Sequence, residues 1–187
     1  YGRTPDQTRV LRRMSEEAGQ KGKLKSQWIG TEEYPPFLFG ADGKVKPEFC
    51  DNGRPVRDFP LGINRLPTGS RQFNELFAVG GDRVNATPYT AAMGTLWLRE
   101  HNRLAGMLER HYPDWDDERV FETARNIVIV MFIKLVVEEY INHISSAAAS
   151  FSANPRICWS AGWNRPNWMT TEFSLLYRWH SLIPQKL

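Results

Sequence analysis

The sequence predicts an all-α fold with a loop-rich N-terminal half. Two long segments between residues 87 and 140 carry apolar side chains at helical spacing, and a third helix-length segment lies near residue 180. Gly, Pro, Asp and Asn interrupt the first 85 residues repeatedly. Three helices are few for a complete bundle, so we expect this chain of 187 residues to be a fragment of a longer domain.

Composition and charge exclude several classes of function. The formal net charge of +3 is small and its charges are interspersed, which gives no indication of nucleic-acid binding. Cys50 and Cys158 are too few for a disulfide framework, and no His/Cys cluster has zinc spacing. No signal peptide is recognisable, and we expect a cytoplasmic or peripheral membrane location.

The first 85 residues are expected to be mostly irregular. Short strands are predicted at residues 23–29 and around residues 44–46. The dipeptide Asp42-Gly43 is of the kind that closes a two-residue hairpin.

The first long helix is predicted to begin after Thr87. Thr is a favoured cap, and Pro88 fits the first helical turn. Apolar residues then recur at helical spacing as far as His111, and Tyr112-Pro113 ends the helix.

Asp114 or Asp116 is predicted to cap the second long helix, which runs to Tyr140 or beyond. Its apolar run, residues 127–137, is interrupted by Lys134 and is too short to span a bilayer. Because the helix is apolar almost all round, we expect it to be buried at the centre of the fold.

The third helix carries the residues of greatest chemical interest. Thr170 or Thr171 is predicted to cap it and Pro184 to end it. Tyr177 and His180 are three residues apart and share one face. His is a natural axial ligand of haem iron, and Tyr can hold a one-electron hole. The alternative is that both are ordinary packing residues with satisfied polar tips.

The run Tyr177-x-x-His180, with Glu172-Phe173 before it and Leu182-Ile183-Pro184 after it, resembles a known motif. It is similar to the proximal haem helix of the cyclooxygenase and fatty-acid dioxygenase branch of the animal-type haem peroxidases. The resemblance implies that His180 ligates the iron and that Tyr177 becomes the hydrogen-abstracting radical. Peroxidases of this superfamily that do not oxygenate fatty acids typically carry Arg in place of Tyr177.

Two further runs resemble the same family. Residues 96–103 include the Arg-Glu-His-Asn-Arg run of the superfamily, and we expect His101 to belong to a structural polar network and not to bind iron. Residues 134–144 resemble the cyclooxygenase helix with a second tyrosine, so Tyr140 is expected to support the radical site through a phenol–phenol hydrogen bond. A core packing residue is the alternative. The channel-mouth tyrosine of cyclooxygenases is replaced by Ala147.

The segment around Gly80-Gly81-Asp82-Arg83 is similar to the peroxidase stretch that brings a distal Arg to the haem. Arg83 takes the Arg position, which implies a cation beside the haem, and a surface ion pair is the alternative. The ester-forming Glu of that stretch is replaced by Ala86. The implied cofactor is therefore haem b bound without a covalent link, with iron held by His180.

The resemblance implies that residues 1–187 are the middle, proximal portion of one mostly helical haem peroxidase catalytic domain, without its distal half and C-terminal part. The expected function is haem-dependent fatty-acid dioxygenation with peroxidase activity. The expected partners are a fatty acid, O2 and peroxide, with peripheral membrane association through other parts of the protein. The alternatives are a peroxidase using H2O2 and small reductants, or a non-catalytic fragment that packs with its missing halves.

Overall fold

The chain divides into two compact units, Tyr1–Leu135 and Val136–Leu187, in a computed structural model. The residues that the structure describes are 1–2, 4–51, 54–55, 75–144, 150–154, 156–157 and 161–162.

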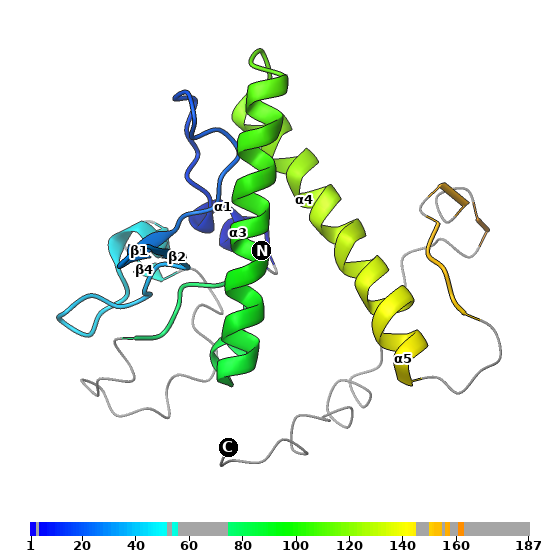
Figure 1. Ribbon diagram of the computed structural model, residues 1–187. Helices are drawn as coiled ribbons and strands as arrows, with labels where there is room; N and C mark the ends of the chain where they lie inside the picture. Colours follow the sequence, from blue (N-terminus) through cyan, green and yellow to red (C-terminus); the bar gives the residue numbers. More distant parts are fainter. Residues whose placement is uncertain are drawn as a thin grey trace. The chain divides into compact units, whose positions relative to one another are not determined.

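Two long helices form the frame of the first unit: α3, Pro88–His111, and α4, Asp117–Lys134 (Figure 1). Thr87 caps α3 in a reciprocal capping box, in which its hydroxyl accepts from the Thr90 N–H at 3.2 Å and the Thr90 hydroxyl accepts from the Thr87 N–H at 3.1 Å. The side chain of Asp116 caps α4 by accepting a hydrogen bond of 2.7 Å from the Arg119 N–H, without a reciprocal bond. The predicted starts of both helices, and the end of α3, are therefore confirmed.

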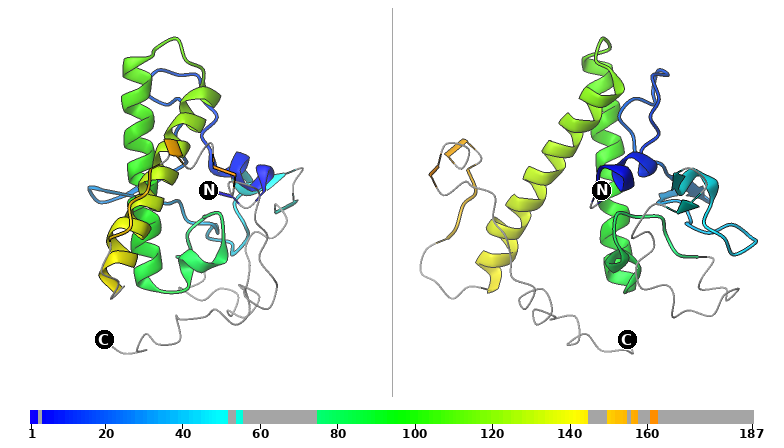
Figure 2. Two further views of the ribbon diagram at one scale, coloured as in Figure 1. Left: turned by 90° about the vertical axis from the view of Figure 1, so that its right-hand side faces the viewer. Right: turned by 180° about the vertical axis from the view of Figure 1, so that it is seen from behind.

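The elements that precede α3 are short. They are α1, β1 paired antiparallel with β2, the 3-10 turn η1, β3 paired antiparallel with β4, and the 3-10 turn η3, and they lie beside α3 (Figure 2). Their bounds are α1 Pro5–Leu11, β1 Gln27–Ile29, β2 Glu32–Tyr34, η1 Pro47–Phe49, β3 Cys50–Asp51, β4 Arg54–Pro55 and η3 Asp82–Asn85.

The predicted strands are confirmed only in part. Of the expected strand at residues 23–29, only Gln27–Ile29 forms, and it turns at Gly30 (φ 62°) to pair with β2. The turn at Asp42-Gly43 does form, with Gly43 at φ 72°, and a single bridge joins Phe39 to Val45 across it. Gly accepts these positive φ values without a steric penalty, which explains why both turns contain it.

The core of the first unit lies between α1, α3, the beginning of α4 and the loops that precede α3. Phe49 and Phe121 are completely buried, and burial of each such ring contributes about 1.5–3 kcal/mol. The main cluster consists of Val10, Leu11, Leu24, Leu38, Phe39, Phe49, Ala78, Leu98 and Phe121.

The expectation that the second long helix is buried holds only for its first half. Val120, Phe121, Ala124 and Val128 are buried, whereas the apolar residues that follow in the described chain are largely exposed. Ile129, Met131, Phe132 and Ile133 have 39–48% of their surface accessible. Phe121 in the first half belongs to the main cluster of the first unit, whereas no described residue of the second half does.

In the second unit the predicted helix continues past Tyr140, with altered winding. Leu135–Ile141 forms a π-helical segment, η4, and α5 (Asn142–Ile144) follows it. Helices dominate the described residues and the strands have two or three residues each, so the all-α prediction is confirmed. Among the described helices, none combines the length and the apolar character needed to cross a membrane.

Candidate functional site

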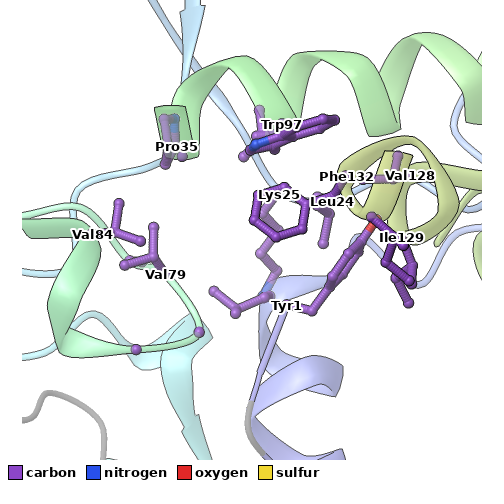
Figure 3. A pocket seen from close by; sticks show the side chains of 17 residues that line it. Tyr1, Leu24, Lys25, Pro35, Val79, Val84, Trp97, Val128, Ile129 and Phe132 are labelled. Carbon is purple, nitrogen blue, oxygen red and sulfur yellow. The ribbon is translucent and has the colours of Figure 1, made fainter. Parts of the chain in front are cut away.

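The first unit contains an apolar cavity of about 690 Å³, a size typical of small-molecule and cofactor sites. Figure 3 shows side chains from α3, α4, the N-terminal segment and the loop before η3 converging on it. Its walls are mainly aliphatic and aromatic, and include Leu24, Val79, Val84, Trp97, Val128 and Phe132.

Side chains of α3 and α4 form the two main walls of the cavity. Val128 and Phe132 are four residues apart on α4 and therefore share a face. The ring of Phe132 meets Trp97 of α3 edge to face, with centroids 5.5 Å apart and planes at 77°. The Nε1–H of Trp97 is buried and has no hydrogen-bond partner among the described residues, so this wall holds an unsatisfied polar atom.

Glycines bring the turn η3 close to α3 and to the N-terminal segment. A Cβ at Gly94 would lie 2.6 Å from Cγ1 of Val84, so only Gly allows η3 to pack this closely on α3. A Cβ at Gly80 would overlap the Tyr1 carbonyl. The backbone of Arg83, which belongs to η3, is thereby held at the border of the cavity, next to the lining residue Val84.

Beside the cavity, the half-exposed Tyr1 and the fully buried His101 form a hydrogen-bonded pair. The Nε2 of His101 is 2.8 Å from the Gly22 carbonyl, which can only accept, so Nε2 carries the proton. Nδ1 then accepts from the Tyr1 hydroxyl at 2.8 Å. Burial lowers the pKa of His101 to about 4, with a smaller opposing effect from the Gly22 hydrogen bond. Burial also raises the pKa of the Tyr1 phenol.

Arg99 and Asn102 of the Arg-Glu-His-Asn-Arg run bind the β-hairpin and the loop before it, whereas Glu100 and Arg103 pair with each other. Arg99 donates from Nε to the Glu33 carbonyl at 2.6 Å and pairs with Glu32 at 2.8 Å. The Oδ1 of Asn102 accepts from the Leu24 N–H at 2.8 Å, and its Nδ2 donates to the Glu33 carboxylate at 2.9 Å. The prediction of a structural polar network is confirmed, and both ring nitrogens of His101 are occupied within it.

The structure also contains a buried ion pair that the sequence did not predict. The Nη2 of Arg12 donates to Asp117 at 2.6 Å, and its guanidinium lies 4.0 Å above the ring of Phe121. The other oxygen of Asp117 accepts from the Gly22 N–H at 2.7 Å. The pair joins the N-terminal segment to the start of α4 across 105 positions, and no local spacing in the sequence indicates it.

The predicted site residues are distributed over both units. Arg83 lies on η3 of the first unit, and Tyr140 lies on η4 of the second unit with 60% of its surface exposed. Tyr177 and His180 lie outside the described residues, as do Ala147 and Cys158. Their roles remain predictions.

Metal and disulfide chemistry give no further site in the part of the chain that the structure describes. That part contains no group of three or more His, Cys, Asp or Glu residues placed to hold a metal ion. Cys50 is a free thiol, and its Sγ lies 3.6 Å from the Lys46 carbonyl.

The cavity fits the chemistry of haem b, a flat and largely apolar ring with two carboxylate substituents. Its walls are apolar, and the one lysine among the described residues of its lining, Lys25, donates from Nζ to the Glu48 carbonyl at 2.9 Å. Gly81 leaves open space where a side chain would stand, next to the turn that carries Arg83. The apolar walls of the cavity therefore suit a flat, largely apolar ring.

Comparison with known proteins gives one consistent family. The family model for animal haem peroxidase matches residues 1–187. Prostaglandin G/H synthase 2 of Equus caballus is 33% identical over 184 residues, which is 98% of this chain and 26% of the relative. Prostaglandin G/H synthase 1 of Mus musculus is 34% identical over 163 residues, or 87% of this chain and 24% of the relative.

A solved structure agrees with these relatives. Peroxidase A from Dictyostelium discoideum superposes with a TM-score of 0.56 at 29% sequence identity, over 75% of this chain and 23% of that one. This chain thus spans about a quarter of the length of the proteins that it matches. The mostly helical haem peroxidase fold expected from the sequence is confirmed.

Proposed function

This chain belongs to the animal haem peroxidase family, and from that premise we propose that it acts in the haem-dependent oxygenation of a fatty acid, with an accompanying peroxidase activity. The supporting observation is Tyr177, three residues before His180, in a chain whose relatives include prostaglandin G/H synthases. Peroxidases of the superfamily that do not oxygenate fatty acids have a similar motif, but they typically carry Arg in place of the tyrosine.

In this proposal His180 holds the iron through one ring nitrogen, and a hydrogen bond to its other ring nitrogen tunes its donor strength. Haem b supplies, when bound, a one-electron oxidant that peroxide generates. Tyr177 gives up one electron and its phenolic proton. The phenoxyl radical would then take a hydrogen atom from the fatty acid, which restores the phenol, and O2 would add to the carbon radical. The resulting peroxyl radical would take the hydrogen atom of the Tyr177 phenol, which gives a fatty-acid hydroperoxide and regenerates the phenoxyl radical.

Other residues would bind the cofactor or support the radical. Arg83 on η3 is proposed as a cation beside the haem. Tyr140 is proposed to donate a hydrogen bond that tunes the oxidation of Tyr177. Ala86, at the position of the ester-forming Glu, implies that the haem is held without a covalent link.

Oxygen uptake by the haem-loaded, full-length protein tests the proposal. We expect consumption of O2 when a polyunsaturated fatty acid and a trace of peroxide are supplied. Phenolic reductants alone should support peroxide reduction without O2 uptake. Peroxide reduction at a normal rate, with no O2 uptake on any fatty acid, would reject the dioxygenase function.

A peroxidase that uses H2O2 and small reductants is the second candidate. Ala147 stands where cyclooxygenases carry the channel-mouth tyrosine that binds the substrate carboxylate. The solved structural relative is itself a peroxidase by name. Under this alternative Tyr177 is a bystander, and its replacement leaves all activity unchanged.

A further inference from the structure

The helix that carries Tyr140 changes its winding over a segment that includes this residue. Residues Leu135–Ile141 are π-helical, between α4 and α5. A π-helix bonds residue i to i+5 and so accommodates one residue more per turn than an α-helix; such turns are rare and often occur at functional sites. Each α-helical residue advances about 100° around the axis, so one extra residue redirects the side chains that follow it.

The side chain of Asn142 closes the end of this segment. Its Nδ2 donates to the carbonyl of Glu138, four residues earlier on the helix, at 2.8 Å. The same Nδ2 donates to the Phe151 carbonyl at 2.9 Å, and Oδ1 accepts from the Phe151 N–H at 2.7 Å. Both N–H groups and the oxygen of the amide are therefore engaged.

A second anchor lies one helical turn earlier. The carboxylate of Glu138 accepts from the Ala153 N–H at 3.0 Å. Glu138 and Asn142 are four residues apart and share a face, whereas Tyr140 is two residues from each and points away from that face. The helix face that carries Glu138 and Asn142 is thus hydrogen-bonded to residues 151–153. Tyr140 lies on the opposite face, with 60% of its surface exposed.

We propose that Asn142 is a positioning residue: its amide holds the π-helical segment against residues 151–153 and thereby sets the direction of the Tyr140 phenol. The role of Tyr140 beside the radical site rests on the proposed function. Without the amide, the Glu138 carbonyl loses its side-chain donor and the segment regains α-helical register. A change of one residue in register turns Tyr140 by about 100° around the axis.

The first test observes the direction of Tyr140 without using activity. Fluorotyrosine is placed at position 140 of the full-length, haem-loaded protein, and its fluorine NMR resonance is recorded. Asn142→Ala should shift this resonance. Asn142→Asp keeps the side-chain size and the acceptor for the Phe151 N–H but lacks the two donors, and it should produce a comparable shift.

Asn154→Ala is the matched control. It removes a hydrogen bond of 3.1 Å to the Arg156 N–H, which lies in the same segment but does not reach the helix. This control should leave the fluorine resonance at its wild-type position. An unchanged resonance in Asn142→Ala and Asn142→Asp would overturn the proposal.

The second test is a double-mutant cycle on oxygenation. Asn142→Ala and Tyr140→Phe should each lower the rate of O2 uptake about 2–10-fold, the effect of one hydrogen bond, with peroxide reduction unchanged. If Asn142 acts through Tyr140, the double variant is no slower than Tyr140→Phe alone. Effects that multiply would reject this coupling. A fluorine shift in a protein that oxygenates no fatty acid would support the positioning role and reject the proposed function.

Discussion

The Tyr1 hydroxyl donates a hydrogen bond of 2.8 Å to Nδ1 of His101, across 100 positions of the sequence. His101 is completely buried, and its other nitrogen binds the Gly22 carbonyl. The imidazole therefore joins the N-terminal segment to the middle of α3. This arrangement assigns His101 to the structure of the domain.

Replacement of His101 by Ala should destabilise the protein by about 2–4 kcal/mol, since it creates a cavity and leaves the buried Gly22 carbonyl without its donor. Urea denaturation measures the loss, and His111→Ala, an exposed site on the same helix, is the control. Haem spectra of the folded variant should be unchanged. A folded His101→Ala protein without iron coordination would contradict the structural assignment.

His101 should also give the protein a measurable pH dependence. Burial holds its folded-state pKa at about 4, below the ordinary 6.5, so the unfolded chain binds the proton more readily. Its contribution to stability is complete above pH 6.5 and is lost as the pH falls towards 4, by about 3 kcal/mol in total. In denaturation experiments over this range, His101→Gln should show a smaller slope of stability against pH. Equal slopes would show that His101 is not the titrating group.

Arg12→Met should cost about 3–5 kcal/mol, because it leaves the buried carboxylate of Asp117 without its charged partner. Arg12 also pairs with Glu118, but that side chain is 64% exposed. Glu118→Gln should therefore cost less than about 1 kcal/mol. Denaturation experiments that give the free energies of unfolding of the two variants test whether the two losses differ. Similar losses would mean that burial does not distinguish the two carboxylates.

Tyr177→Phe should eliminate fatty-acid oxygenation and leave haem binding and peroxide reduction close to wild type. Phenylalanine retains nearly the same packing but cannot form a phenoxyl radical. Rapid-freeze electron paramagnetic resonance after addition of peroxide should show a tyrosyl signal in the wild type that changes in the variant. Wild-type O2 uptake by Tyr177→Phe would favour the small-reductant peroxidase.

His180→Ala should abolish the five-coordinate high-spin haem spectrum of the full-length protein, because the axial nitrogen is removed. Added imidazole should restore the spectrum if the cavity left by the side chain admits it. His143→Ala, which alters an exposed histidine on α5, is the control and should leave the spectrum unchanged. A normal spectrum in His180→Ala would move the ligand to another residue.

The starts of the two long helices were predictable from the sequence because caps act locally. Thr87 and Asp116 bond to backbone groups three residues away, so their effects are visible in a short stretch of chain. The structural role of His101 was also predictable, since a polar run among large apolar residues must be internally satisfied when buried. The family was recognisable from runs of residues that include Tyr177 and His180.

Tertiary structure alone decided which residues meet across long separations. The pairing of Arg12 with Asp117 and of Tyr1 with His101 depends on how the chain closes on itself, and no local spacing encodes it. Packing likewise decided that Phe121 is buried and Phe132 exposed on one apolar helix. The π-helical segment that contains Tyr140 is followed by Asn142, whose amide bonds to the distant Phe151, and no local spacing in the sequence predicts that contact.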